Sequence, residues 1–239
     1  MKDGVALSLV LPCYNEAEIF EESVARIVEV MEASSLSYEV IFVEDKSRDH
    51  TADLVRGALK KNKKFRAIFH PTNRGRGATV ADGIRAARGK VVGFIDIDCE
   101  VSPVYIPEMV RLILTNETDV AVGNRIYRTG LASIHREILS AGYRWLANVM
   151  IGTGRIDTES GYKFFDRKKI LPVLSLTKHP GWFWDTEIVV LAKRAGLRVI
   201  AHPVLFLRRS DKISTVNVIE DTIDYLQSLW RFRQQLYKS

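Results

Sequence analysis

Residues 5–16 read VALSLVLPCYNE. The stretch 5–11 is a continuous β-favouring run, which predicts a buried strand that ends at Pro12. Asn15 can then cap a helix whose apolar residues recur at spacings of three and four between Ile19 and Met31. A strand, a polar turn and an amphipathic helix in this order predict an α/β fold.

The same unit repeats along the first half of the chain. Further strands are predicted at 38–43, 66–69, 91–95 and 119–122. Helices are predicted to begin at Asp49, to cover 77–88 and to begin near Pro107. Strands that are apolar on both faces and alternate with helices indicate a mostly parallel, doubly wound sheet flanked by helices.

The second half predicts a helix around 133–151, a strand at 161–166, a helix at 185–195, a strand at 197–207 and a final helix at 216–237. No linker, repeat or low-complexity tract separates these elements. We therefore expect a catalytic domain over 1–207, followed at 208–239 by an acceptor loop and a C-terminal amphipathic helix.

Composition excludes several classes of protein. The 239 residues are 46% hydrophobic and 27% charged, which is typical of a globular chain. Cys13 and Cys99 are too few for a disulfide scaffold or a zinc site, so we expect reduced thiols in a cytosolic protein. No apolar stretch approaches the roughly 18 residues of a membrane-spanning helix. The net charge of +6 is spread along the chain without a nucleic-acid motif, which disfavours a non-enzymatic module that binds nucleic acid.

Acidic clusters follow three of the predicted strands. Glu16 follows the first strand, Glu44 and Asp45 end the second, and Asp96, Asp98 and Glu100 follow the fourth. Ligands of open α/β sheets bind beyond the carboxyl ends of the strands. Carboxylates gathered there repel one another unless some accept hydrogen bonds from a ligand and others hold a divalent cation. The alternative for each cluster alone is helix capping by Asn15, Asp45 or Asp98.

The Asp96-Ile97-Asp98 sequence suits Mg²⁺ or Mn²⁺ held against a diphosphate, because hard cations prefer oxygen ligands. Glu100 is a further candidate metal ligand. Asp45 or Glu16 could accept from the ring N–H groups of a nucleotide base while Tyr14 packs on it. Three arginines are available for phosphate charge: Arg74, Arg76 and Arg125.

The order of these motifs resembles glycosyltransferase family 2, which has the GT-A fold. The motifs are Pro12-Cys13-Tyr14-Asn15-Glu16, Val43-Glu44-Asp45-Lys46-Ser47-Arg48-Asp49-His50-Thr51, Asn73-Arg74-Gly75-Arg76-Gly77 and Ile95-Asp96-Ile97-Asp98. The second half more closely resembles the polyprenyl-phosphate or dolichyl-phosphate hexosyltransferases. Its motifs are Val122-Gly123-Asn124-Arg125, Asp157-Thr158-Glu159-Ser160-Gly161-Tyr162-Lys163-Phe164-Phe165 and Phe183-Trp184-Asp185-Thr186-Glu187.

This resemblance implies roles for particular residues. The nucleotide would be lined by Pro12, Tyr14, Glu16, Val43 and Asp45. Asp96, Ile97 and Asp98 would lie at the metal and diphosphate, and Arg125 on the acceptor side. Glu100 replaces a glutamine usual in dolichyl-phosphate mannose synthases, and 183–185 lacks a lysine that they often carry. These departures favour the glucosyl branch but leave the donor sugar open, so the expected donor is a nucleotide diphosphate sugar of the GDP-mannose or UDP-glucose type.

The acceptor determines which side chains act. A lipid monophosphate is ionised near neutral pH and needs no strong base, only cations that align it. Candidates for that task are Arg125, Arg208, Arg209 and Lys212. A saccharide hydroxyl, as in cell-surface polysaccharide synthesis, would instead need Asp185 or Glu187 as a base. The alternative for Asp185 and Glu187 is a capping pair at a helix start.

The C-terminal helix carries a broad apolar stripe and basic residues near its end. Such a helix could lie on the cytoplasmic face of a membrane, where the acceptor is embedded, or meet a membrane partner. The alternatives are docking on its own domain or on a second subunit of a homodimer. Trp182 and Trp184 could floor a sugar or polyprenyl groove, or could pack beneath a loop.

Overall fold

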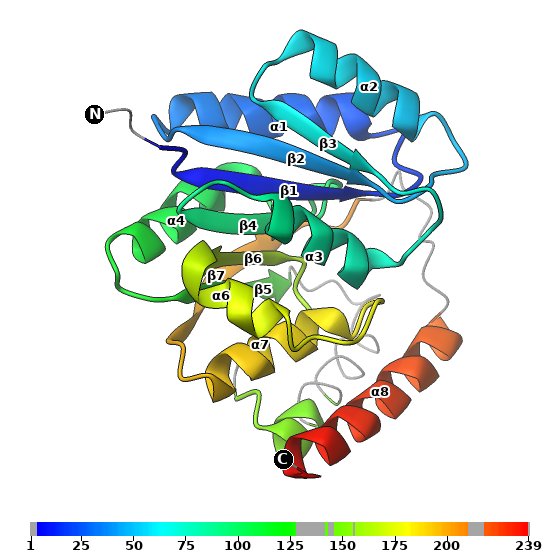
Figure 1. Cartoon of the computed structure of the whole chain (residues 1–239), viewed down its shortest axis with the longest axis vertical. Helices are drawn as coiled ribbons and strands as arrows, with labels where there is room; N and C mark the ends of the chain where they lie inside the picture. The colour runs from blue at the N-terminus through cyan, green and yellow to red at the C-terminus, as the bar shows by residue number, and fades with distance from the viewer. Residues whose placement is uncertain (1–3, 128–141, 143–145, 155, 210–217, 239) are drawn as a thin grey trace.

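The computed structural model describes residues 4–127, 142, 146–154, 156–209 and 218–238 (Figure 1). Its strands are β1 Leu7–Cys13, β2 Tyr38–Glu44, β3 Phe65–Phe69, β4 Val91–Ile95, β5 Val120–Tyr127, β6 Tyr162–Asp166 and β7 Val199–Phe206. Its α-helices are α1 Phe20–Ala33, α2 Thr51–Lys61, α3 Arg76–Ala86, α4 Ile106–Leu114, α6 Arg167–Leu174, α7 Trp184–Arg194 and α8 Val218–Lys238. A 3₁₀ turn, η1 Pro103–Tyr105, precedes α4.

The strands form one sheet in the order β3-β2-β1-β4-β6-β5-β7. β1 pairs in parallel with β2 and β4, and β5 pairs in parallel with β7. β6 is antiparallel to both of its neighbours, β4 and β5. The predicted α/β class with a mostly parallel sheet is confirmed, and the antiparallel β6 separates two parallel groups of strands.

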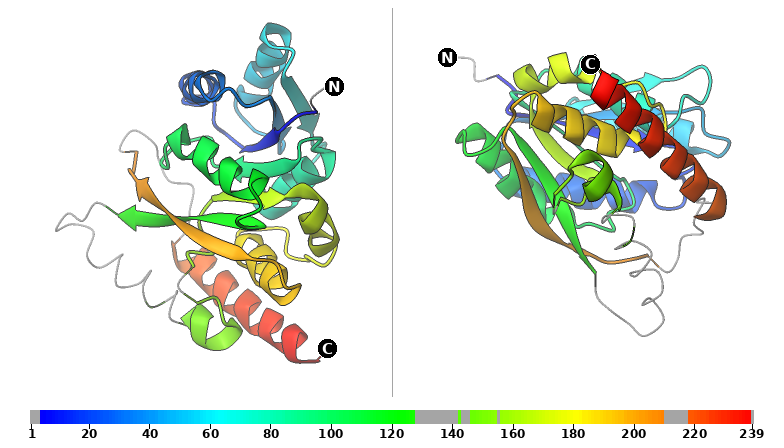
Figure 2. Two further views of the ribbon diagram at one scale, coloured as in Figure 1. Left: turned by 90° about the vertical axis from the view of Figure 1, so that its left-hand side faces the viewer. Right: turned by 90° about the horizontal axis from the view of Figure 1, so that it is seen from below.

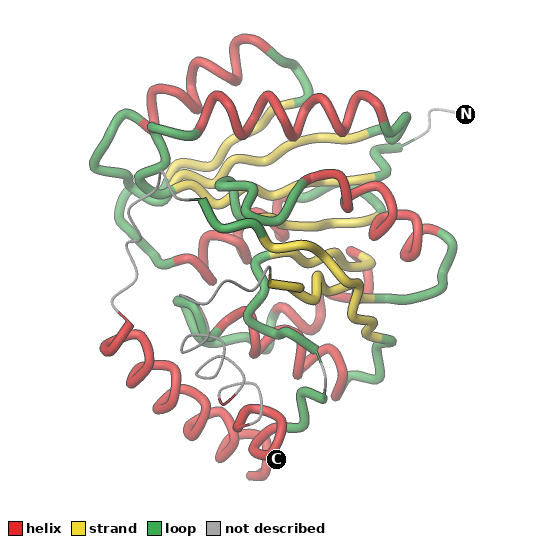
Figure 3. The backbone as a smooth tube through the Cα atoms, turned by 180° about the vertical axis from the view of Figure 1, so that it is seen from behind, coloured by secondary structure: helices red, strands yellow, loops and turns green. Residues whose placement is uncertain are grey.

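Helices cover both faces of the sheet, as Figure 3 shows from behind. Side chains alternate along a strand, so Leu9 packs with α1, α2 and α4, whereas Val10 packs with α3, α6 and α7. Each face therefore has its own apolar cluster. This arrangement explains why the strands are apolar on both sides.

The first strand does not end at Pro12, as the sequence had suggested, but continues to Cys13. Pro12 pairs with Val43 of β2, while the ladder with β4 stops at Val10. Proline is tolerated there because that side of β1 no longer needs a backbone donor. Helix α1 likewise begins at Phe20, so Asn15 does not cap it.

Helix α6 was not expected from the sequence. The carboxylate of Asp166 accepts the N–H of Lys169 at 3.1 Å and caps the helix where β6 ends, so no separate turn marks its start. Most of the helix predicted at 133–151 lies outside the described residues, and 146–151 is helical.

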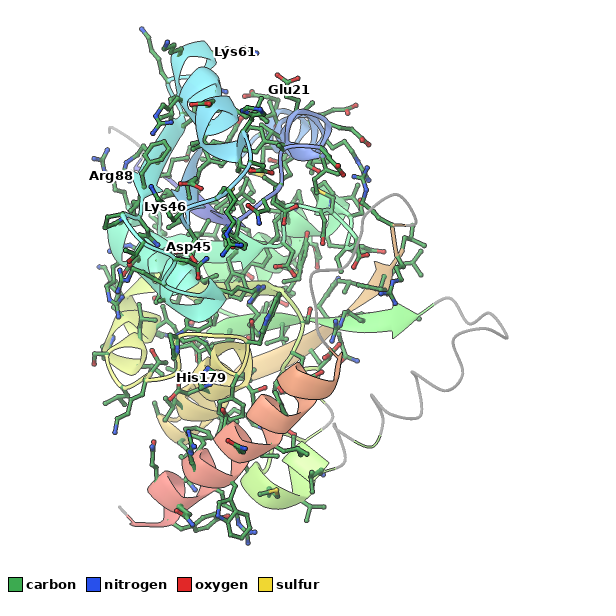
Figure 4. All side chains as sticks on the ribbon, turned by 90° about the vertical axis from the view of Figure 1, so that its right-hand side faces the viewer. Glu21, Asp45, Lys46, Lys61, Arg88 and His179 are labelled. Atoms are coloured by element: carbon green, nitrogen blue, oxygen red, sulfur yellow. The ribbon has the colours of Figure 1, made fainter. Side chains whose placement is uncertain are left out.

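Helix α8 is docked on its own domain, one of the alternatives left open by its sequence pattern (Figure 2). Leu229, Phe232 and Leu236 are buried against Phe183 and Val190 of the α7 region. On other sides of α8, Leu226, Trp230 and Tyr237 are exposed. His179, labelled in Figure 4, also ties α8 to the body, because its Nε2 lies 3.0 Å from the Ser228 hydroxyl.

Candidate active site

Three loops leave the sheet at one edge, because β1, β2 and β4 are parallel neighbours. A residue with positive φ follows each strand: Asn15 at 56°, Lys46 at 61° and Cys99 at 54°. Such left-handed conformations are uncommon for residues other than glycine, and here they turn the chain sharply. The structure thus gathers the acidic loops 14–16, 44–46 and 96–100 at one edge.

The first two loops are tied together by hydrogen bonds. The N–H of Glu16 donates to the Thr51 hydroxyl at 2.8 Å, and the N–H of Asn15 donates to that of Ser47 at 3.1 Å. The side-chain oxygen of Asn15 accepts the N–H of Arg48 at 2.8 Å instead of capping α1. The two loops therefore form one connected wall.

The predicted nucleotide-lining residues differ in burial. Pro12, Tyr14 and Glu16 are half-buried, so part of each side chain can face a ligand. Val43 and Ile97 are buried in the core, which leaves only their backbone groups to contribute.

Asp45 is buried and organises the loop before α3 (Figure 4). Its carboxylate accepts the N–H of Arg74 at 2.8 Å and that of Gly75 at 2.9 Å. His70 Nδ1 lies 2.7 Å from the same carboxylate, and His70 Nε2 lies 3.2 Å from Asp82. Asp45 is thus not a helix cap, and its predicted contact with the nucleotide base stays a prediction.

Gly75 is required by the path of this loop. Its φ is +86°, and a Cβ there would lie 2.8 Å from the carbonyl oxygen of Pro180. The guanidinium of Arg74 pairs with Asp82. Arg74 is therefore engaged with α3, to which Asp82 belongs.

Arg76, the first residue of α3, joins two acidic residues that are far apart in the sequence. Its Nη2 lies 2.5 Å from Asp96 Oδ1, and its Nη1 pairs with Asp185. The guanidinium carbon lies 5.0 Å from the ring centroid of Trp182. Burial would lower the pKa of Arg76, but the adjacent Asp185 and Asp96 carboxylates outweigh it and raise that pKa. Arg76 therefore stays charged at the edge of the site.

The other oxygen of Asp185 holds a buried lysine. Lys163 Nζ lies 2.6 Å from Asp185 Oδ1 and donates to the carbonyl of Ser160, and the Lys163 side chain is 0% exposed. Burial lowers the pKa of Lys163, and the Asp185 carboxylate opposes that shift. No role for Lys163 is predicted from the sequence, although a lysine between aromatic residues of a buried strand is a signal for one.

Gly161, which has no side chain, leaves room for the ion pair between Arg76 and Asp96. A Cβ at Gly161 would overlap the Asp96 carboxylate and the Nη2 of Arg76. The carbonyl of Gly161 also accepts the N–H of Asp96 at 3.0 Å. A glycine is therefore needed here for close approach and not for an unusual φ.

A cleft connects the acidic edge to Arg125. It is lined by Asp96, Asp98, Glu100, Val101, Arg125, Gly161, Tyr162 and Phe206. Arg125 is held by Asp157, with Nε to Oδ2 at 2.6 Å and Nη2 to Oδ1 at 3.0 Å. This two-point pairing orients the guanidinium in the wall of the cleft.

The remaining predicted acceptor residues are placed differently from one another. Arg209 donates its N–H to Glu100 Oε1 at 3.1 Å, and its guanidinium lies 3.2 Å from Glu22. Arg208 is exposed at the end of β7. Lys212 lies outside the described residues.

Asp185 and Glu187, the predicted bases, are both buried and engaged. Glu187 accepts the N–H groups of Lys178 and His179, each at 3.0 Å, and so shapes the loop before α7. Asp185 lies between two cations. Neither carboxylate caps α7, whose N-cap is Phe183, and the role of a general base stays a prediction for both.

The metal prediction rests on two carboxylates. Asp96 is partly exposed and Asp98 half-buried in the cleft, so both offer the oxygen ligands that Mg²⁺ and Mn²⁺ prefer. The side chain of Glu100 is instead engaged with the N–H of Arg209. Across the described residues, no group of three or more His, Cys, Asp or Glu side chains is arranged to hold a metal ion. The residues fit a cation that takes its other ligands from a diphosphate and water.

The aromatic and thiol predictions are resolved by burial. Trp184 is 1% exposed in the core, so it cannot floor a groove, whereas Trp182 is 52% exposed beside Arg76. Cys13 and Cys99 are buried free thiols, as expected. Like Lys163, three other engaged residues have no role predicted from the sequence, because their partners lie far away in the chain: Asp157, His70 and Asp82.

Comparison with known proteins supports the family suggested by the motifs. Glycosyltransferase AglD of Haloferax volcanii is 30% identical over 237 residues, which are 98% of this chain and 38% of that protein. A dolichyl-phosphate β-glucosyltransferase of Trichomonas vaginalis is 27% identical over 247 residues, which are 98% of this chain and 73% of that protein. A dolichyl-phosphate β-glucosyltransferase of Dictyostelium discoideum is 27% identical over 82% of this chain and 65% of its own length.

Solved structures share the fold. Glucosyl-3-phosphoglycerate synthase of Mycobacterium tuberculosis, in complex with Mn²⁺, UDP-glucose and phosphoglyceric acid, has a TM-score of 0.67 at 22% identity. That match covers 96% of this chain and 80% of the other. A mannosyltransferase of Pyrobaculum calidifontis, in complex with GDP-mannose and Mn²⁺, has a TM-score of 0.59 at 16% identity, over 88% of this chain and 59% of the other.

Within the described part of the chain, none of the helices is long and apolar enough to cross a bilayer. The family model for glycosyl transferase family 2 matches residues 8–170, which include all three acidic loops, the whole of β6 and the first half of α6. The chain belongs to glycosyltransferase family 2.

Proposed function

We propose that this chain transfers a hexose, with inversion, from a nucleoside diphosphate sugar to a polyprenyl or dolichyl phosphate at the cytoplasmic face of a membrane. The observation that carries the proposal is the cleft in which Asp96 and Asp98 share a surface with Arg125. Carboxylates that suit a metal and a cation that suits a phosphate thus line one space. The dolichyl-phosphate β-glucosyltransferases among the relatives support glucose, from a UDP-glucose type of donor.

The donor side of the site is built from the acidic loops. Asp96 and Asp98 would hold Mg²⁺ or Mn²⁺, which when bound offsets the charge of the departing nucleoside diphosphate. Arg76, next to Asp96, can donate to a phosphate oxygen. Tyr14, Glu16 and the loop ordered by Asp45 would receive the base and ribose.

The pairing of the carboxylates near the cleft supports a phosphate acceptor. Asp157 is paired with Arg125, Asp185 with Arg76 and Lys163, and Glu187 with backbone N–H groups. A phosphate acceptor brings an oxygen that is ionised near neutral pH and needs no base. Arg125, held by Asp157, would align that phosphate with the anomeric carbon and reduce the repulsion between the two anions.

Exposed apolar residues lie at the ends of β5 and β7 and on α8. Ile126, Leu205 and Leu207 are exposed where β5 and β7 end, close to the cleft residue Phe206, and Arg208 follows them. Leu226 and Trp230 are exposed on α8. These surfaces support a peripheral contact with the membrane that contains the acceptor.

The test is transfer of radiolabelled sugar from a panel of UDP- and GDP-sugars to a short polyprenyl phosphate or to free saccharides, with Mn²⁺, with Mg²⁺ or with EDTA. We expect label in the organic phase from UDP-glucose and a divalent metal, and none with EDTA or with the Asp98→Asn variant. Label found only in water-soluble saccharides would contradict the lipid acceptor. Undiminished turnover in excess EDTA would contradict the metal.

A further inference from the structure

Lys163 is fully buried within a strand, yet ion pairs through Asp185 and Arg76 link it to Asp96 at the proposed donor site. It is in β6, and its neighbours in the chain, Tyr162 and Phe164, are 1% and 0% exposed. Its ammonium contacts Asp185 and the carbonyl of Ser160, and lies 5.3 Å from the ring centroid of Phe94. Lysine is almost never fully buried unless it is paired.

The ion pairs continue without a break to the edge of the cleft. Lys163 holds one oxygen of Asp185, Arg76 holds the other, and Arg76 in turn holds Asp96. Lys163 and Asp185 are 0% and 2% exposed, Arg76 is 11% exposed, and Asp96 is 41% exposed. The chain of charges therefore runs from the core outward to the residue predicted to meet the metal and the diphosphate.

Arg76 is confined on its other sides as well. Its guanidinium carbon lies 5.5 Å from the centroid of Phe94 and 5.0 Å from that of Trp182. Phe94 contacts both cations, since Lys163 also lies near its ring. The guanidinium thus has little freedom while Asp185 stays in place.

Stability alone does not account for a buried lysine at this position. Replacing a buried ion pair by apolar residues of similar volume is often neutral or stabilising. A strand of aromatic residues could accommodate methionine or leucine there. An apolar side chain at position 163 would no longer hold the Asp185 carboxylate in a fixed orientation between two cations.

We infer that Lys163 is a positioning residue of the donor site, which acts through Asp185 to fix the guanidinium of Arg76 beside Asp96. This inference rests on the proposed function, because it assigns the fixed arginine to the diphosphate of the donor. It also gives Asp185 a role other than that of a base. An arginine already oriented by the protein loses less conformational freedom when the diphosphate binds.

The experiment compares Lys163→Met, the double variant Lys163→Met/Asp185→Asn, and Lys169→Met as a matched control. Lys169 forms a lysine–aspartate pair of equal length, 2.6 Å, with Asp119, away from the cleft. Calorimetry with UDP or GDP in the presence of Mn²⁺ measures donor-site affinity, and thermal unfolding measures stability. We expect both Lys163 variants to bind the nucleotide about tenfold more weakly, and the control to bind it within about twofold of wild type.

Coupling to Arg76 separates positioning from a structural role. In an Arg76→Ala background, Lys163→Met should change the nucleotide affinity by less than about twofold, because the guanidinium that it orients is gone. Additive effects of the two substitutions would overturn the inference. Wild-type nucleotide affinity in Lys163→Met/Asp185→Asn would also overturn it. Because this variant removes both buried charges together, it can still be measured if the single variant unfolds.

Crystal structures of wild type and of the two Lys163 variants provide a readout that does not depend on donor identity. We expect the Arg76 guanidinium beside Asp96 in wild type, and displaced or without density in both variants. An unmoved Arg76 would overturn the inference even if the enzyme is active. If wild type bound neither UDP nor GDP, the proposed function would fall, and the position of Arg76 would still decide whether Lys163 orients it.

Discussion

The loops after β1 and β2 contain carboxylates, and so does the cation chain, the linked ion pairs Lys163–Asp185–Arg76–Asp96. The two regions stabilise these carboxylates differently. Asp45 accepts backbone N–H groups of Arg74 and Gly75, which lie 29 and 30 residues further along the chain, beyond α2 and β3. Asp185 is held by two cationic side chains, one of them 109 residues away. Backbone donors belong to any sequence that takes that path, whereas the cations depend on particular side chains.

The difference has an energetic consequence. A carboxylate with backbone partners loses hydrogen bonds worth about 1.5–3 kcal/mol each when it is removed. Removing one partner of a buried ion pair leaves an uncompensated charge, at a cost of about 3–5 kcal/mol. We therefore expect substitutions in the loops to weaken ligand binding in steps that follow the number of hydrogen bonds lost. Substitutions in the cation chain should change both the position of Arg76 and the stability of the fold.

The largest effect on transfer is expected at Asp98, which lines the cleft beside Asp96 at the outer end of the cation chain. Asp98→Asn removes a charged ligand from the proposed metal while relieving repulsion from Asp96 and Glu100. We expect transfer to fall by about a thousandfold or more, since a metal contributes several kcal/mol of charge stabilisation. Stability should be unchanged or higher. Initial rates as a function of Mn²⁺ concentration, with thermal unfolding as the control, test this, and a wild-type response to Mn²⁺ would remove Asp98 from the site.

Gly161→Ala tests the cation chain from its outer side. The new methyl group would overlap Asp96 and Arg76, so one of them must move. We expect transfer to fall by about a hundredfold, as for a displacement of about 1 Å at a reacting centre, with a stability loss of about 1–3 kcal/mol from overpacking. Steady-state kinetics and chemical denaturation measure the two. A fully active variant would show that the close approach of Asp96 and Arg76 is dispensable.

Asp45→Ala tests the loop region. The N–H groups of Arg74 and Gly75 would lose their shared acceptor, and the loop before α3 would lose its anchor. We expect UDP and UDP-sugar to bind about tenfold to a hundredfold more weakly, and to a similar extent, because the lost contact is remote from the reacting bond. Calorimetry with both ligands measures this. A selective loss for UDP-sugar alone would instead place Asp45 near the transferred hexose.

Glu187→Gln distinguishes a structural carboxylate from a base. An amide oxygen can keep accepting the N–H groups of Lys178 and His179, although more weakly. We expect kcat to change by less than about threefold and the free energy of unfolding to fall by about 1–2 kcal/mol. A loss of a hundredfold or more, with a changed pH profile, would identify a base and favour a hydroxyl acceptor.

The smallest effect on transfer is expected for Asp119→Asn, remote from both regions. Arg198 first, and then Lys169, hold the pKa of Asp119 well below its ordinary value. A lowered folded-state pKa stabilises the protein fully above the unfolded value, near pH 4, and this contribution is lost as pH falls below it. Asp119→Asn should therefore lower stability at pH 7 and flatten its decline in acid, while transfer stays at the wild-type rate. Denaturation between about pH 2 and pH 7 tests this, and an unchanged acid profile would contradict it.

Residues of the site could be predicted where the signal lies within one segment of the chain, but not where it depends on contacts between distant segments. The acidic loops were recognisable because each follows its own apolar strand, and parallel strands place their carboxyl ends at one edge. The engagement of Asp185 and Glu187 was not recognisable. Their positions at the start of a predicted helix favoured capping or catalysis, while the actual partners come from β6, α3 and the 178–179 loop.

The sequence by itself determined the class of fold, the order of most strands and helices, and the acidic edge, since apolar periodicity and turn residues act over a few positions. Tertiary structure alone decided that β6 enters the sheet antiparallel between β4 and β5, which brings Lys163 beneath Arg76 and Gly161 against Asp96. The physical reason is range. Hydrophobic patterns are set by neighbours along the chain, whereas the partner of a buried charge is set by distance in space.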